Sequence, residues 1–199
     1  MSFTSFIEDC TDSQFPDMRL FVGIPLAPLV IQELSALITR LQSKTDGLRW
    51  VMPQSWHITL QFLGYASQQQ YECVVERLFG LSSRLVTIQL GEPGIFDRAG
   101  IFFVRVRPAS ALILLQQQVS AATESCGFAG ETRPYRPHVT LARRKGQRGA
   151  VGFGKLKAKI GDQPRFSSFL AQEFVLYESI TRPAGSQYEI RERFPLCGR

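Results

Sequence analysis

The chain has 199 residues, of which 44% are hydrophobic and 20% are charged. This balance excludes an intrinsically disordered protein, and the length allows one large domain or two small ones. No apolar run is long enough to span a bilayer, and the net charge of +6 favours an anionic partner.

The first segment predicts no regular structure, and we expect residues 1–18 to form an irregular N-terminal extension. Its charged residues before Arg19 are all acidic: Glu8, Asp9, Asp12 and Asp17. This excludes a signal or transit peptide, so we expect a cytoplasmic location. The four cysteines, which are Cys10, Cys73, Cys126 and Cys197, show no paired spacing. We therefore expect reduced thiols, with neither a disulfide framework nor a zinc site.

Strands and helices alternate along the rest of the chain. The hydrophobic pattern predicts a strand at 19–24, a helix over 26–41 with Pro28 in its first turn, and strands at 48–51 and 56–63 that end at Gly64. A helix at 71–79 and a strand at 86–90 follow, and then a turn at 91–94. The second half predicts a strand at 101–106, a helix over 112–122 that stops near Gly127, and closing strands at 171–177 and 188–194. This alternation indicates an α+β fold with two small sheets.

The two halves resemble each other at an offset of 81 residues. Matching pairs are Leu20 with Ile101, Phe21 with Phe102, Ile31 with Leu112, Leu34 with Leu115, Ile38 with Val119, and Pro53 with Pro134. We interpret residues 19–99 and 100–199 as similar halves that share one core in a single domain, 19–199. Packing of the halves about a pseudo-two-fold axis would bring equivalent residues into one cleft.

The same offset joins the only two histidines in the chain. His57 opens the sequence HITL and His138 opens HVTL, so each is followed by a threonine, Thr59 or Thr140. Residues i and i+2 of a strand point to the same face, so each frame presents a histidine and a threonine together.

These groups suit the opening of a phosphodiester, especially a strained cyclic one. The reaction needs a base to accept a proton from water and an acid to protonate the leaving oxygen, and histidine suits both because its ordinary pKa is about 6.5. The two threonine hydroxyls can donate to the phosphate oxygens. Two histidines fall short of the three protein ligands usual in a catalytic zinc site, so we expect neither a metal nor another cofactor. The alternative is that duplication alone preserved both frames, but the halves differ almost everywhere else.

A basic segment follows the second frame. Residues 142–165 contain eight basic side chains against Asp162 alone, a net charge of +7, together with five glycines. The glycines predict a mobile loop. We interpret this loop as a contact for the phosphate backbone of a nucleic acid, with a solvated basic loop as the alternative.

The two histidine frames, read with their flanks, carry a resemblance to a known family. Residues 56–64 read WHITLQFLG and residues 133–143 read RPYRPHVTLAR. With the opening RLFVGIP at 19–25 and EFVLYES at 173–179, they resemble the two-histidine phosphoesterase superfamily. Within it, the chain is similar to the LigT/ThpR family of RNA 2′,3′-cyclic phosphodiesterases, also called 2′-5′ RNA ligases. The resemblance extends from about residue 19 to residue 194.

The resemblance implies a bilobal fold with two pseudo-symmetric lobes, each with a small, mostly antiparallel sheet and outer helices, and an active-site groove between the sheets. It implies metal-free hydrolysis of RNA 2′,3′-cyclic phosphate ends to 2′-phosphates, and we expect the chain to be a monomer. Family practice makes His57 the acid and His138 the base, although the residues alone leave these roles interchangeable.

Further site residues follow from the resemblance and its flanks. Thr59 and Thr140 carry over as phosphate binders. Arg143 matches an arginine that recurs five residues after the second histidine, although strict alternation places it on the face opposite His138. Tyr135 and Phe21 are candidates to stack on a base, with a core position as the alternative for Phe21.

Three rival functions remain open at this point. The same acid–base pair could join RNA ends through a 2′-5′ linkage. The chain could be a non-catalytic RNA-binding module, or it could act on another small cyclic phosphodiester.

Overall fold

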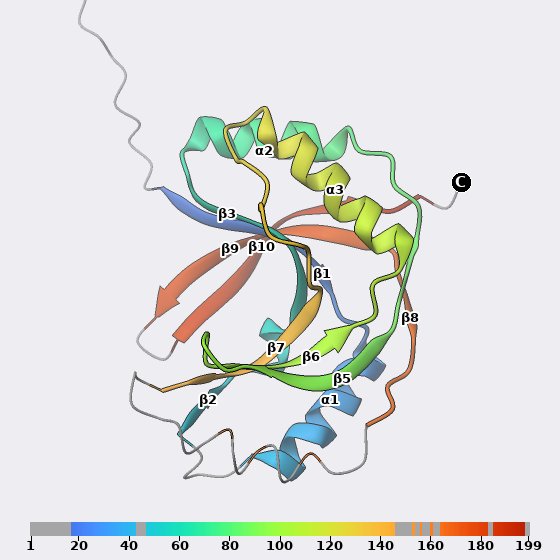
Figure 1. Cartoon of the computed structure of the whole chain (residues 1–199). Coiled ribbons are helices and arrows are strands. Elements are labelled where there is room, and N and C mark those ends of the chain that lie inside the picture. The colour runs from blue at the N-terminus through green and yellow to red at the C-terminus, as the bar shows by residue number, and fades with distance from the viewer. Residues whose placement is uncertain are drawn as a thin grey trace, which may run out of the picture.

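The computed structural model describes residues 17–42, 47–145, 153, 156, 160, 164–182 and 185–197. The predicted α+β class is confirmed: small antiparallel sheets and helices form a two-lobed molecule (Figure 1). The expected extension 1–18 lies outside the described residues except for its last two, and so does most of the basic segment 142–165. None of the described helices has the length and apolar character needed to cross a membrane.

Two sheets of four strands each form the body of the described chain. The first sheet has, in spatial order, β10 (Gly185–Pro195), β9 (Glu173–Arg182), β1 (Met18–Pro25) and β3 (His57–Ala66). The second sheet has β2 (Leu48–Trp50), β7 (His138–Arg144), β6 (Ile101–Val106) and β5 (Leu90–Phe96). β4 (Val86–Ile88) and β8 (Phe169–Ala171) pair separately. All pairs are antiparallel.

Helices lie on the outer faces of the two sheets. In Figure 1, α2 (Gln68–Phe79) and α3 (Ser110–Glu124) lie above the first sheet, and α1 (Pro28–Leu41) lies below the second. Pro28 occupies the first turn of α1, as expected, because a proline needs no hydrogen-bond partner there. The short 3-10 helix Pro53–Ser55 leads directly into β3.

The sheets and the sequence halves do not coincide. β1 and β3 from the first half share a sheet with β9 and β10 from the second, and β2 and β5 share a sheet with β6 and β7. The helix α3, from the second half, contacts β3 of the first half. The halves are therefore interlocked around a shared core.

The strands differ from the prediction at two places that contain glycines. β3 continues past Gly64, which has a φ of +85°, and ends at Ala66. The predicted turn at 91–94 is wrong, because these residues belong to β5. A Cβ at Gly94 would lie 2.6 Å from Phe103 Cζ, so this glycine makes room for an aromatic ring of the neighbouring strand.

The first strands of the two halves, β1 and β6, do not keep the 81-residue offset of the histidine strands. Gly23 pairs with Thr59 and Phe103 pairs with Thr140, so β1 and β6 are related by an offset of 80. A shift of one residue exchanges the two faces of a strand. Phe21 therefore faces the space between the sheets, whereas Phe102 is buried in the main core.

The prediction that all cysteines are reduced is wrong. Cys73 and Cys126 form a disulfide with a Cα–Cα distance of 5.8 Å. The two residues are 53 positions apart, and packing of α2 against α3 brings them together. Their spacing gave no signal of this pairing. Cys197 is a free, exposed thiol.

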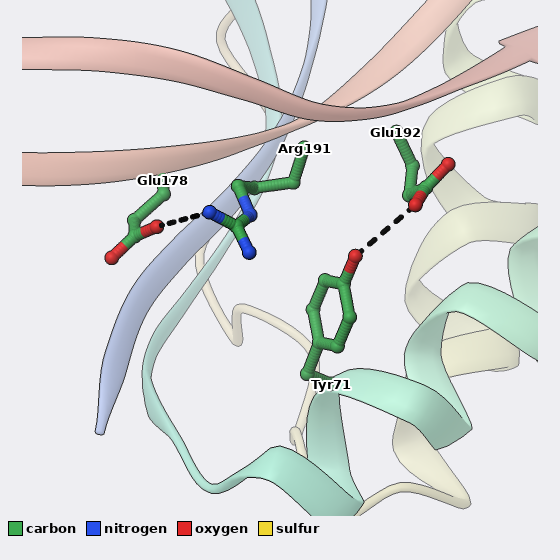
Figure 2. Close-up of polar contacts among 4 residues, drawn as sticks. All are labelled: Tyr71, Glu178, Arg191 and Glu192. Carbon is green, nitrogen blue, oxygen red and sulfur yellow. Dashed lines mark hydrogen bonds and ion pairs between the residues drawn. The ribbon is translucent and has the colours of Figure 1, made fainter. Parts of the chain in front are cut away.

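Polar contacts attach α2 to the edge of the first sheet. Figure 2 shows Tyr71 of α2 donating its hydroxyl proton to Glu192 Oε1 of β10 over 3.1 Å. The Arg191 guanidinium lies between Tyr71 and Glu178, 5.9 Å from the Tyr71 ring centroid and 3.3 Å from Glu178 Oε2. These contacts join α2 to the edge strand β10 and to its neighbour β9.

Candidate active site

A cleft of about 600 Å³ lies between strands of the two sheets. Both histidines and both threonines line it, His57 and Thr59 from β3 and His138 and Thr140 from β7. Arg143 lines the same cleft. The structure therefore brings together the residues to which the sequence assigned chemistry, although they are far apart along the chain.

The two imidazoles are held in the same way. His57 Nδ1 lies 2.8 Å from the Ser55 carbonyl oxygen, and His138 Nδ1 lies 2.8 Å from the Arg136 carbonyl oxygen. A carbonyl oxygen can only accept, so each Nδ1 carries a proton and donates it. In the neutral ring, Nε2 is then the nitrogen that can accept a proton, and in the charged ring it can donate one.

A β-bulge in each histidine strand places a third side chain in the cleft. Leu60 of β3 and Leu141 of β7 have no partner in the strand register, and they are 81 residues apart. Beyond each bulge the alternation of faces is shifted by one residue. The bulge at Leu141 thus turns Arg143 to the same face as His138, which strict alternation did not allow.

The environment of the cleft lowers the pKa of both histidines. Burial lowers the pKa of His57 to about 4; the hydrogen bond to the Ser55 carbonyl opposes this, and the charges of His138 and Arg143 add to it. Burial and the charge of Arg143 also lower the pKa of His138, against its hydrogen bond to the Arg136 carbonyl. Both rings are consequently neutral near pH 7 in the empty cleft, and a bound anion would raise both pKa values.

Aromatic rings pack against both imidazoles. The centroid of the Phe21 ring lies 4.6 Å from that of His57, and the Tyr188 ring meets His57 edge-on at 5.1 Å. Phe96 and Phe103 meet His138 edge-on at 5.3 and 5.4 Å. Phe21 is only 2% exposed, so its position suits support of His57 better than stacking on a base.

Two further arginines line the cleft, and the sequence analysis did not select them. Arg49 of β2 is the direct cross-strand partner of Arg143, and Arg19 of β1 lies on the opposite sheet. Both are exposed. Their signal in the sequence was only a basic residue within a predicted strand, which is common on solvated faces. Together the three guanidinium groups give the cleft a cationic end suited to phosphate.

Tyr135 lies beside the cleft and forms a hydrogen bond to one of the strands that line it. Its hydroxyl donates to the Thr59 carbonyl oxygen over 2.9 Å, which joins the loop before β7 to β3. Burial raises the pKa of this phenol, so it remains protonated and able to donate. Among the described residues, no group of three or more His, Cys, Asp or Glu is placed to hold a metal ion.

Comparisons with known proteins show what the whole chain is similar to. The family model described as the 2′-5′ RNA ligase superfamily matches residues 30–181. An RNA 2′,3′-cyclic phosphodiesterase from Bacillus subtilis is 30% identical over 170 residues, which are 82% of this chain and 90% of the relative. One from Geobacillus stearothermophilus is 29% identical over 89% of this chain, and the match spans only 57% of its length. The crystal structure of apo LigT from Escherichia coli has the same fold, with a TM-score of 0.76 and 23% identity over 92% of this chain and 99% of that one.

Proposed function

Since the chain belongs to the 2′-5′ RNA ligase superfamily, we propose that it hydrolyses RNA 2′,3′-cyclic phosphate ends to 2′-phosphates. The observation that carries this proposal is the convergence of His57 and His138 on one cleft, each with Nδ1 bound to a backbone carbonyl. This arrangement presents one acid and one base to a single phosphorus atom.

The reaction needs two proton transfers. A base accepts a proton from water as the water oxygen attacks phosphorus, the bond from phosphorus to O3′ breaks, and an acid donates a proton to O3′. We assign the base to His138 and the acid to His57, following the resemblance. Because burial lowers the pKa of His57 to about 4 in the empty cleft, this assignment requires the substrate anion to raise it.

The other lining groups stabilise the phosphate in this proposal. Thr59 and Thr140 share faces with their histidines and can donate hydroxyl protons to the two non-bridging oxygens. Arg143 can donate from the same face because of the bulge at Leu141. Donors that are already in position when charge develops stabilise a transition state without reorganisation.

The substrate and setting are also part of the proposal. The named activity of the relatives and the cationic cleft support an RNA end as substrate. We further propose that the chain acts as a monomer in the cytoplasm, although disulfides such as Cys73–Cys126 are uncommon there. Size-exclusion chromatography with light scattering and cell fractionation would test these two points.

The direct test is incubation with an oligonucleotide that ends in a 2′,3′-cyclic phosphate. Phosphorus NMR should show the cyclic resonance replaced by that of a 2′-monoester, and His57→Ala and His138→Ala should show no conversion while remaining folded. Adding an RNA with a 5′-hydroxyl tests the reverse reaction, since a joined product would identify a ligase. RNA binding that persists without any turnover would identify a binding module instead.

A further inference from the structure

The cleft has cationic side chains that the proposed chemistry does not use. The reacting phosphate needs the histidines and threonines, with Arg143 on the same face as His138. Arg19 of β1 and Arg49 of β2 line the same cavity from opposite sheets. The cavity volume of about 600 Å³ is typical of a site for a whole small molecule, so the cleft has room for more than one phosphate group.

The positive charge of the cleft exceeds what one cyclic phosphate can balance. A cyclic phosphodiester carries a single negative charge, which Arg143 alone can balance. No aspartate or glutamate is among the described residues that line the cleft. The ion pairs within the described part of the chain involve other arginines, so Arg19 and Arg49 have no ionic partner there. Two exposed guanidinium groups without a counter-charge in one cavity favour a second anion.

Strand pairing places neutral hydrogen-bond donors beside Arg19. Phe21 of β1 lines the cleft, pairs with Tyr177 of β9 and stacks on its ring. Arg19 and Ser179 each lie two residues from that pair, so both point to the face that lines the cleft. Ser186 of β10 lines the cleft as well. Serine hydroxyl groups and guanidinium groups both donate hydrogen bonds to phosphate oxygens, so the chemistry of this surface suits a phosphate.

The surface lies about one nucleotide from the reacting phosphate. Gly23 of β1 is the partner of Thr59, and Arg19 is four residues, or about 13 Å, from Gly23 along the strand. One ribose and one arginine side chain can together span this distance. In an RNA chain, the ribose that carries the 2′,3′-cyclic phosphate also carries, on its 5′ carbon, the phosphodiester to the preceding nucleotide. This phosphodiester is the second anion of the substrate that lies nearest to the reacting phosphorus.

We propose that Arg19 and Arg49, with the hydroxyl groups of Ser179 and Ser186, bind the phosphodiester on the 5′ side of the terminal nucleotide. The proposal rests on the proposed function, because it concerns the same substrate. The site distinguishes the end of an RNA chain, which has this second phosphate, from a nucleoside 2′,3′-cyclic phosphate, which lacks it. RNA ends are therefore preferred to small cyclic nucleotides.

The first test compares three substrates that differ only at the 5′ carbon. Adenosine 2′,3′-cyclic phosphate has a hydroxyl group there, its 5′-(methyl phosphate) has the charge of a chain phosphodiester, and its 5′-(methyl methylphosphonate) has a similar shape without the charge. We expect kcat/KM to be about ten-fold or more higher for the charged compound than for the other two, because only it accepts charge-assisted hydrogen bonds. Equal values for the charged and uncharged 5′ groups would overturn the phosphate site while leaving the hydrolase intact.

The second test removes both cations of the site. Arg19→Gln combined with Arg49→Gln should reduce the preference for the charged 5′ group over the uncharged one to about two-fold or less. This ratio isolates the 5′ phosphate, because a general loss of activity affects both substrates equally. Arg77→Gln combined with Arg84→Gln removes the same charge from exposed positions that do not line the cleft, and it should leave the ratio unchanged. A ratio that persists without Arg19 and Arg49, or that falls equally in the control, would overturn the proposal.

A binding measurement separates this proposal from the proposed function. Calorimetry can compare adenosine 2′-phosphate with its 5′-(methyl phosphate) at several salt concentrations. The 5′-(methyl phosphate) should bind about ten-fold more tightly, and the slope of log affinity against log salt should be steeper by about 0.7 for the one additional phosphate. This result would support the site even if no substrate were hydrolysed, and equal affinities with equal slopes would overturn it. Failure to hydrolyse any of the three cyclic phosphates would instead contradict the proposed function.

Discussion

Arg49 and Arg143 face each other directly across β2 and β7, and both line the cleft. Like charges at directly opposed positions destabilise an antiparallel pair. An anion held between the two guanidinium groups would remove this repulsion. The pair is therefore better explained by a ligand than by the stability of the sheet.

We expect Arg49→Gln to have opposite effects on stability and binding. In phosphate-free buffer it should raise the free energy of unfolding by about 0.2–1 kcal/mol, because it removes a like-charge pair. It should weaken inhibition by 2′-phosphate product about ten-fold, because a hydrogen bond to a charged group is lost. Urea unfolding and inhibition constants measure the two effects. The exposed Arg84→Gln serves as the control, and loss of stability in Arg49→Gln would contradict this account.

Much of this site could be predicted from periodicity alone. His57 and Thr59 are two residues apart in a strand, as are His138 and Thr140, so their shared faces follow from the geometry of extended chains. The repeat then indicated that both frames would meet. These inferences needed only local geometry and one internal comparison.

The remaining features depend on contacts that local patterns do not encode. The bulges at Leu60 and Leu141 reverse the facing of the residues that directly follow them, up to a second irregularity at Leu63 in β3, and no residue type marks them in advance. Without the bulge, Arg143 would point away from the cleft. The sequence does not reveal the one-residue shift of β1 relative to β6. Both strands are almost entirely apolar, so an offset of 80 residues and an offset of 81 residues both match apolar residues with apolar residues. The disulfide depends on the packing of α2 against α3, which the spacing of the cysteines does not encode.

Gly23 should be intolerant of a side chain because of where it lies. A Cβ there would be 2.9 Å from the Ile58 carbonyl oxygen and 3.5 Å from His57 Cδ2. The backbone of β3 would have to move, and His57 would move with it. We expect Gly23→Ala to destabilise the fold by about 1–3 kcal/mol and to lower kcat by up to about 100-fold. Gly91→Ala, whose Cβ would meet its neighbours at 3.7–3.8 Å, should have little effect on kcat.

The disulfide should stabilise the fold without contributing to the chemistry. Cys73 and Cys126 close a loop of 53 residues, for which loop-closure entropy gives about 4 kcal/mol. Neither residue lines the cleft. We expect Cys73→Ser with Cys126→Ser to lower the urea midpoint strongly and to leave kcat/KM within about two-fold at temperatures where the variant is folded. Peptide mapping without reductant should recover the two cysteines in one linked peptide, and their recovery as separate thiols would contradict the pairing.

The two threonines should matter through their hydroxyl groups. Valine has nearly the same shape as threonine but cannot donate a hydrogen bond. By analogy with other oxyanion donors, Thr59→Val or Thr140→Val should each lower kcat by about 100-fold. The exposed Thr87→Val in β4 provides a strand control. Full activity in either cleft variant would remove that hydroxyl from the phosphate site.

The pKa values of the histidines predict where activity should be greatest. Hydrolysis needs one histidine charged and the other neutral, so kcat/KM should be bell-shaped against pH, with limbs set by the free enzyme. Burial lowers the pKa of His57 to about 4, and the pKa of His138 also lies below its usual 6.5. Above the higher of the two pKa values both rings are neutral, and below the lower both are charged, so the form with a charged His57 and a neutral His138 is available only between them. The maximum should therefore lie between about pH 4 and pH 6.5.

The same reasoning predicts how a mutation should move this maximum. The charge of Arg143 lowers the pKa of both histidines, so Arg143→Gln should raise both and shift the bell to higher pH even as it reduces the maximal rate. The profile of kcat itself should lie at higher pH than that of kcat/KM, because the bound phosphate favours charged imidazoles. These profiles can be measured with a cyclic mononucleotide between pH 4 and pH 9. A flat profile over that range, or an Arg143→Gln bell displaced toward acid, would be incompatible with two coupled histidines that exchange protons around one phosphate.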